Sequence, residues 1–140
     1  MTVPVAPEES VPLRWHEHVT ARVVVVVAWA LTKAPPRRLR RVLQLISRGA
    51  RPADAGRATR ARQVVVTVSA RCAAGHGCLQ RSVAICLWCR ATGYWPDWYT
   101  GVRTRPFRAH AWVEAGGSAV GEAEDMTLFH RMLAVRLTRR

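Results

Sequence analysis

Cys78 is the residue whose position most favours chemistry. It follows Gly77 and begins the apolar stretch CLQRSVAICLWCR, which predicts a helix over Cys78–Arg90. The first N–H groups of a helix lack partners within the helix and lie at the positive end of its dipole, so a thiol there is favoured as the nucleophilic thiolate. A single cysteine is more commonly a buried structural residue, so position alone leaves both interpretations open.

His110 is the candidate base for this nucleophile. The segment RAHAWVE predicts a strand in which His110, Trp112 and Glu114 share one face. A base on a strand that faces a nucleophile at a helix start is a standard arrangement of a Cys–His pair. A lone strand histidine is more commonly a core residue, so only its combination with Cys78 indicates catalysis.

A third group has to orient the imidazole of His110, and three acids are candidates. Glu122 falls on the face of His110, diagonal to it, if the glycine turn at residues 116–117 forms a three-residue loop. Diagonal neighbours lie about 7–8 Å apart, within reach of a glutamate. A two-residue loop would turn Glu122 to the other face, which leaves Asp125 as the fallback and Glu124 as a further candidate.

Tryptophans near these residues are candidates for contacting substrate. Trp95 and Trp98 lie between the predicted nucleophile helix and the strand of the base, and Trp112 lies on that strand. They could line a groove for an apolar substrate side chain, or they could pack in the core.

Metal binding is disfavoured by the placement of the cysteines. Cys86-x-x-Cys89 has the spacing of a ligand pair, but it lies within an apolar helix and lacks a second paired knuckle. We therefore expect no metal and no cofactor; the sequence leaves open whether a nucleotide is required.

The patterns around these residues predict an α+β fold. Residues 1–12 are expected to be disordered, 13–69 to form a basic helical region, and 70–140 to form the catalytic core of one compact domain, in which the nucleophile helix packs on a small antiparallel sheet. Residues 72–77 are expected to form a loop and residues 94–97 a turn. The expected helices and strands are Leu13–Thr32, the helix from Pro35-Pro36 to Gly49, Ala53–Ser69, Cys78–Arg90, Trp98–Thr104, Phe107–Ala115, Ser118–Glu122 and Leu133–Leu137.

The net charge of +13 in 140 residues raises the question of an anionic partner. Ten basic residues and one acid lie between Lys33 and Arg62, without interleaved Trp or Tyr and without a nucleic-acid-binding motif. We interpret this run as a solvated helix face, with docking of an acidic protein or peptide as the second interpretation and nucleic acid as the third.

A cytoplasmic location is expected from the cysteines and the apolar segments. Four cysteines are too few for a disulfide scaffold, and Val23–Leu31 is shorter than the roughly 20 residues that span a bilayer. Peripheral membrane contact stays open.

Two segments, CAAGHGCLQRSVAICLWCR and GYWPDWYTGVRTRPFRAHAWVEAGGSAVGE, closely resemble the lasso-peptide leader peptidases. The shared motifs are GCLQRS around Cys78 and GVRT-x-PF-x-AHAWVE around His110. The resemblance implies a transglutaminase-like, papain-related cysteine protease fold. By this likeness Cys78 attacks the scissile carbonyl, His110 transfers protons, and Glu122 stands where the family has an Asp.

The same resemblance implies a substrate and partners. Such enzymes cut the leader from a ribosomally made precursor peptide, and a cyclase partner then closes the ring. The length of the chain leaves no room for a fused leader-recognition domain, so we expect a separate leader-binding protein, with the basic half as its docking surface. The alternatives are a catalytically idle scaffold that presents the leader and, less favoured, a basic nucleic-acid-binding protein.

Overall fold

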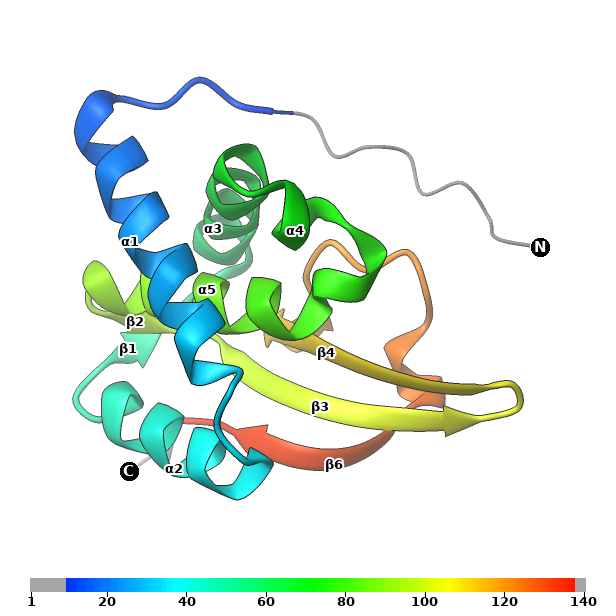
Figure 1. Ribbon diagram of the computed structural model, residues 1–140. Helices are drawn as coiled ribbons and strands as arrows, with labels where there is room; N and C mark the ends of the chain where they lie inside the picture. Colours follow the sequence, from blue (N-terminus) through cyan, green and yellow to red (C-terminus); the bar gives the residue numbers. More distant parts are fainter. Residues whose placement is uncertain (1–9, 138–140) are drawn as a thin grey trace.

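The computed structural model describes residues 10–137, and helix α5 (Cys78–Ala91) runs through the middle of it (Figure 1). Helices α1 and α3 pack on one side of α5, and strand β4 packs on the other. The side chains of Val83, Ile85 and Cys86 are fully or almost fully buried. Because apolar residues occur all round α5, the helix is enclosed rather than facing solvent on one side.

The first half of the chain is helical, as predicted. Helix α1 spans Trp15–Leu31, α2 spans Pro36–Ser47 and α3 spans Ala55–Val68. Asp54 caps α3 by accepting a hydrogen bond of 2.8 Å from the Arg57 backbone N–H. These bounds lie close to the three predicted helices.

A four-stranded antiparallel sheet follows α5 in the second half of the chain. Its strand order is β5-β4-β3-β6, with β3 at Asp97–Thr104, β4 at Phe107–Ala115, β5 at Ser118–Ala119 and β6 at His130–Val135. The α+β class and the small antiparallel sheet are therefore confirmed.

Several predicted elements differ from the structure. The third strand ends at Ala119 instead of Glu122, and the last begins at His130 instead of Leu133. The expected loop overlaps α4 (Ala70–Ala73) and contains the 3-10 turn η1 (Gly75–Gly77). The expected turn contains β2 (Tyr94–Trp95), which pairs in parallel with β1 (Arg51–Pro52). A second 3-10 turn, η2 (Met126–Leu128), precedes β6. The β1–β2 pair joins segments about forty residues apart in the chain, which local patterns do not encode.

The expectation that residues 1–12 are disordered falls mostly on residues 1–9, which lie outside the described residues.

The outer face of α1 exposes apolar side chains, with 80% of Trp15 and 61% of Val26 accessible to solvent. Within residues 10–137, no helix combines the length and the apolar character needed to cross a membrane.

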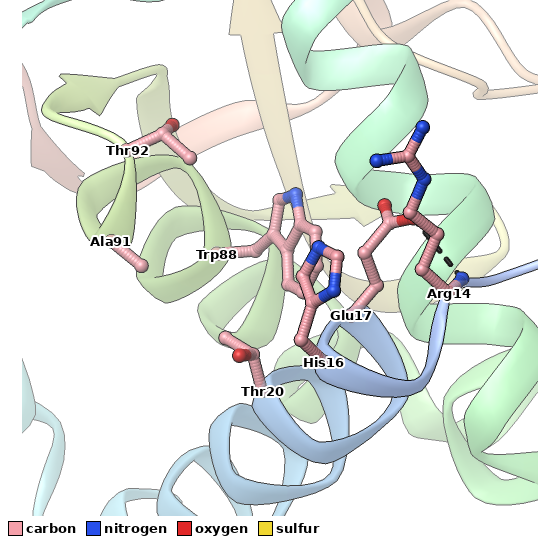
Figure 2. A pocket seen from close by; sticks show the side chains of 7 residues that line it. All are labelled: Arg14, His16, Glu17, Thr20, Trp88, Ala91 and Thr92. Carbon is pink, nitrogen blue, oxygen red and sulfur yellow. Dashed lines mark hydrogen bonds between the residues drawn. The ribbon is translucent and has the colours of Figure 1, made fainter.

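A hollow of about 590 Å³ lies beside the start of α1, with Trp88 of α5 at one wall (Figure 2). Its other lining residues are Arg14, His16, Glu17, Thr20, Ala91 and Thr92. It contains no cysteine and shares no lining residue with the hollow at Cys78 described below.

Candidate active site

Cys78 is the first residue of α5, and the chain enters the helix through a tightly packed turn. A Cβ atom on Gly77 would lie 1.8 Å from the carbonyl oxygen of Arg71, so only glycine fits there. Arg81 Nη1 donates hydrogen bonds of 2.9 Å and 3.3 Å to the carbonyl oxygens of Cys72 and Ala74. These contacts fix the segment that places the thiol at the helix start.

The thiol of Cys78 is activated by its neighbours. Burial alone would raise its pKa, but a hydrogen bond with the His110 side chain, another from the Ala111 backbone N–H, and the charges of His110 and Arg81 together lower the pKa below its ordinary value. The site therefore favours the thiolate, which is the nucleophilic form.

His110, on β4, lies between the thiol and a carboxylate. Its Nε2 is 2.8 Å from Oε2 of Glu122. The ring is also hydrogen-bonded to Cys78, and because Nε2 is occupied by Glu122, this bond uses Nδ1. Burial lowers the pKa of His110, but the bonds to Cys78 and Glu122 and their negative charges raise it to about 9. The three residues therefore support an imidazolium paired with a thiolate.

Glu122 reaches His110 by a route different from the expected one. The turn at Gly116-Gly117 has two residues, because Ala115 pairs directly with Ser118. Continued pairing would have turned Glu122 to the other face, but the strand ends at Ala119, and Gly121 adopts a φ of +68° that redirects the chain. A left-handed glycine, rather than a longer hairpin loop, brings the carboxylate to the imidazole.

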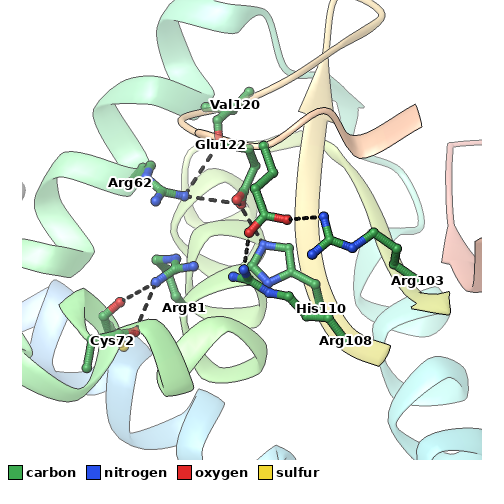
Figure 3. A network of polar contacts seen from close by, with 10 residues as sticks. Arg62, Cys72, Arg81, Arg103, Arg108, His110, Val120 and Glu122 are labelled. Atoms are coloured by element: carbon green, nitrogen blue, oxygen red, sulfur yellow. Dashed lines mark hydrogen bonds and ion pairs between the residues drawn. The ribbon is translucent and has the colours of Figure 1, made fainter. Parts of the chain in front are cut away.

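Arg62 of α3 forms an ion pair with the carboxylate of Glu122 (Figure 3). Its Nη1 lies 3.5 Å from Oε1 of Glu122 and donates to the Val120 carbonyl at 3.4 Å. The Arg62 side chain is 9% exposed and fills the space in which a Cβ atom on Gly121 would stand, 2.4 Å from Arg62 Cδ. Arg62 thus fixes both the carboxylate and the turn that carries it.

The carboxyl group of Glu122 is held ionised. Burial raises its pKa, but the hydrogen bond with His110 and the charges of His110, Arg62 and Arg81 bring the pKa below its ordinary value.

The interpretation of the Lys33–Arg62 run as a solvated face is wrong for Arg62, which sequence reasoning missed as a site residue. The signal was its place on α3: Ala58, Ala61 and Val65 are buried on the same helical face. A charged residue within an apolar stripe requires a buried partner.

The other candidate acids lie away from the imidazole. Asp125 is exposed, and its side chain accepts hydrogen bonds from the backbone N–H and hydroxyl of Thr127. Glu124 pairs with Arg103 and Arg108 on the β3–β4 hairpin.

The three tryptophans proposed for substrate contact are core residues in the structure. Trp95, Trp98 and Trp112 are at most 1% exposed. Trp112 stacks on His110, with ring centroids 6.2 Å apart and an interplanar angle of 11°, so it supports the base instead of facing a substrate.

A hollow of about 240 Å³ opens instead beside Cys78 and His110. The other lining residues are small or apolar: Leu79, Thr100, Gly101, Val102, Ala109, Ala111 and Met132.

The cysteines further along α5 face other surroundings. Burial raises the pKa of Cys86 well above its ordinary value and that of Cys89 to about 12. Within residues 10–137, no three His, Cys, Asp or Glu side chains are grouped to hold a metal ion.

Comparison with known proteins identifies a family. The model of the transglutaminase-like superfamily matches residues 21–134, most of the chain and the whole of the Cys78–His110–Glu122 arrangement. No curated protein and no solved structure matches the chain.

Proposed function

Because the chain belongs to the transglutaminase-like superfamily, we propose that it is a cysteine peptidase that removes the leader peptide from a ribosomally made lasso-peptide precursor. The observation that carries the peptidase assignment is the hydrogen-bonded series from Cys78 through His110 to Glu122. A transglutaminase-like core is commonly that of a cysteine protease or acyltransferase. Among these two classes of enzyme, the GCLQRS and AHAWVE motifs support assignment to the leader peptidases.

The reaction is an acyl transfer through Cys78. The thiolate attacks the carbonyl carbon at the leader–core junction, and the backbone N–H of Cys78, at the start of α5, donates to the oxyanion. His110 protonates the leaving amine as the C–N bond breaks, which frees the core peptide and leaves the leader as a thioester on Cys78. His110 then takes a proton from a water molecule that hydrolyses the thioester, which releases the leader as a carboxylic acid and restores the thiolate–imidazolium pair.

Glu122 keeps His110 in its working state during this sequence. Its carboxylate at Nε2 directs Nδ1 toward the thiol and stabilises the imidazolium that forms when the thiol ionises. A glutamate does here what the aspartate of the leader peptidases does, provided that its longer side chain is held in place. Arg62 supplies that support.

The proposal includes a separate leader-binding protein and a cyclase that uses the freed amine. Exposed arginines on α2, among them Arg37, Arg38 and Arg41, support docking of an acidic leader or partner on this basic face. It also includes a cytoplasmic location, because all four thiols are free and a reducing compartment keeps them so.

Mass spectrometry of the precursor peptide tests this function. The precursor and its leader-binding partner would be incubated with wild-type protein, Cys78→Ala, and the matched control Cys89→Ala, which changes a cysteine of the same helix outside the site. We expect one cut at the leader–core junction with wild type and Cys89→Ala and none with Cys78→Ala. An intact precursor with folded wild-type protein would contradict the proposal and favour the presenting scaffold.

A further inference from the structure

The edge of β4 next to the thiol is unpaired. Strand β5 pairs only with Glu114 and Ala115, and among residues 10–137 no strand pairs with this edge from Phe107 to Ala111. The β3–β4 hairpin also extends beyond the start of α5, so its face there is not covered by the helix (Figure 1). An uncovered strand edge is a template for pairing with an extended peptide.

The backbone of β4 presents its hydrogen-bonding groups to this edge at alternate residues. The Val113 carbonyl accepts a bond of 3.0 Å from Val120, and the Ala111 N–H donates to the Cys78 thiol. Because residues two apart in a strand point their N–H and carbonyl groups the same way, those of Ala109 also face outward. The N–H and carbonyl of Ala109 are therefore the next outward groups along this edge after the Ala111 N–H that contacts the thiol.

The hollow beside this edge is uncharged apart from the catalytic pair. Val102 and Ala109 are cross-strand partners, as are Thr100 and Ala111, and these four side chains form its floor. Met132 of β6 and Leu79 of α5 complete its walls. Apart from His110 and Cys78, the lining contains no ionisable group, and His110 is already bonded to Cys78 and Glu122, so a charged side chain placed here would have no free partner.

We propose that this edge and hollow form a peptide-binding site that takes an extended segment ending at Cys78 and an uncharged side chain close to the scissile bond. The peptide backbone pairs with the outward N–H and carbonyl of Ala109. Directly paired residues in a sheet point their side chains to the same face, so the residue opposite Ala109 projects into the hollow. This inference rests on the proposed peptidase function and adds the class of side chain that the site accepts.

Peptidyl chloromethyl ketones test the site directly. The thiolate sulfur of Cys78 forms a bond to the probe's methylene carbon, and the C–Cl bond breaks to release chloride, so the step requires no co-reactant. The probes would be acetyl-Ala-Val-Gly chloromethyl ketone, its Asp counterpart in place of Val, and the Val probe N-methylated at the valine amide. Intact-mass measurement gives each alkylation rate relative to iodoacetamide, which reports only the reactivity of the thiol.

We expect the Val probe to react at least about tenfold faster than the Asp probe, because His110, the cation of the lining, is already paired with Cys78 and Glu122 and leaves a further carboxylate without a partner. N-methylation should reduce the Val rate, since it removes a backbone donor. Ala109→Trp, which fills the hollow, should abolish the Val preference, measured as the ratio of the Val rate to the Asp rate in that variant. Leu128→Ala, at an exposed side chain outside the lining, should preserve both this ratio and the iodoacetamide rate.

Equal rates for the Val and Asp probes would overturn the inference, as would a Val preference that survives in Ala109→Trp. If Ala109→Trp does not fold, the N-methylated probe decides with wild-type protein alone. These experiments distinguish failure of the proposed peptidase function from failure of the proposed binding site. A cleaved precursor without a Val preference contradicts only the binding site, whereas a Val preference with an intact precursor contradicts only the leader-peptidase assignment.

Discussion

Cys78 and Cys89 lie at opposite ends of α5 and differ sharply as chemical groups. At the start of the helix, partners outweigh burial and lower the pKa of Cys78. Near its end, burial outweighs the charge of Arg57 and raises the pKa of Cys89 to about 12. The reactivity of a thiol on this helix is therefore set by what surrounds it.

The difference arises from how the neighbouring elements meet each end. The start of α5 reaches the unpaired edge of β4, where His110 and the Ala111 N–H contact the thiol. The interior of α5 is enclosed by α1, α3 and β4, whose apolar side chains provide no hydrogen-bond donor or positive charge to stabilise a thiolate. Removing a partner at the start of the helix should therefore raise the pKa of Cys78 and make its thiol as unreactive as that of Cys89.

The largest such effect is expected for His110→Ala. Without the imidazolium the thiol loses both a hydrogen bond and a positive charge, and cleavage loses its general acid. We expect precursor cleavage to fall by about 10²–10⁴-fold, the usual contribution of a general acid–base group. His130→Ala, at an exposed histidine on β6, is the control and should retain activity. Equal activity in the two variants would mean that His110 is not the base.

A smaller loss, with a change in pH dependence, is expected for Glu122→Gln. Burial lowers the pKa of His110, and Glu122 helps to raise it to about 9, so the pKa should fall when the negative charge is removed. Cleavage requires the protonated imidazole, so the alkaline limb of the rate profile should move to lower pH. The rate at each pH checks this, with Glu114→Gln as control, because Glu114 pairs with Arg131 away from the imidazole. An unmoved alkaline limb would contradict the role of Glu122.

Arg62→Met should reduce the cleavage rate less than Glu122→Gln does, by roughly tenfold. Glu122 keeps its bond to His110 in this variant but loses the ion pair with Arg62 that holds its carboxylate in place. Removing one partner of a buried ion pair typically destabilises a protein by about 3–5 kcal/mol, which urea unfolding would detect. Arg62→Lys should recover part of the rate, and Arg37→Met, at an exposed arginine of α2, should change neither property. A rate unchanged in folded Arg62→Met would show that Glu122 does not need this contact.

The smallest effect is expected for Cys89→Ala at the far end of α5. Its thiol has no role in the site, so the alkylation rate of Cys78 should be unchanged. The free energy of unfolding should fall by about 1 kcal/mol, as is common for a small core truncation. Slower alkylation of Cys78 in this variant would show that the two ends of the helix are coupled.

The sequence was sufficient for the parts of the site that local patterns encode. The Gly77–Cys78 helix start and the alternation around His110 predicted two elements whose side chains the structure brings together. Pro35-Pro36 and Gly49 predicted the limits of the second helix, which spans Pro36–Ser47 in the structure.

The remaining features depend on tertiary contacts. The path of residues 120–122 follows from Gly121, whose left-handed φ is matched to the Arg62 side chain packed against it. Trp98 is buried because it packs in the core and donates a hydrogen bond of 3.1 Å to Ser82. The place of Arg62 in an apolar stripe indicates a buried partner but does not identify it, and the contact of Trp98 with Ser82 has no signature in the local pattern.

The central claim is that His110 activates Cys78, and the pH dependence of alkylation tests it most directly. Wild-type protein would be treated with limiting iodoacetamide from pH 5 to pH 10, and each cysteine would be quantified by peptide mapping. We predict that Cys78 is modified first at pH 7, well below the ordinary thiol pKa, with Cys86 and Cys89 protected, and that this reactivity is lost in His110→Ala. Modification of Cys78 only as the pH approaches the ordinary thiol pKa, with the same profile in both proteins, would contradict the account.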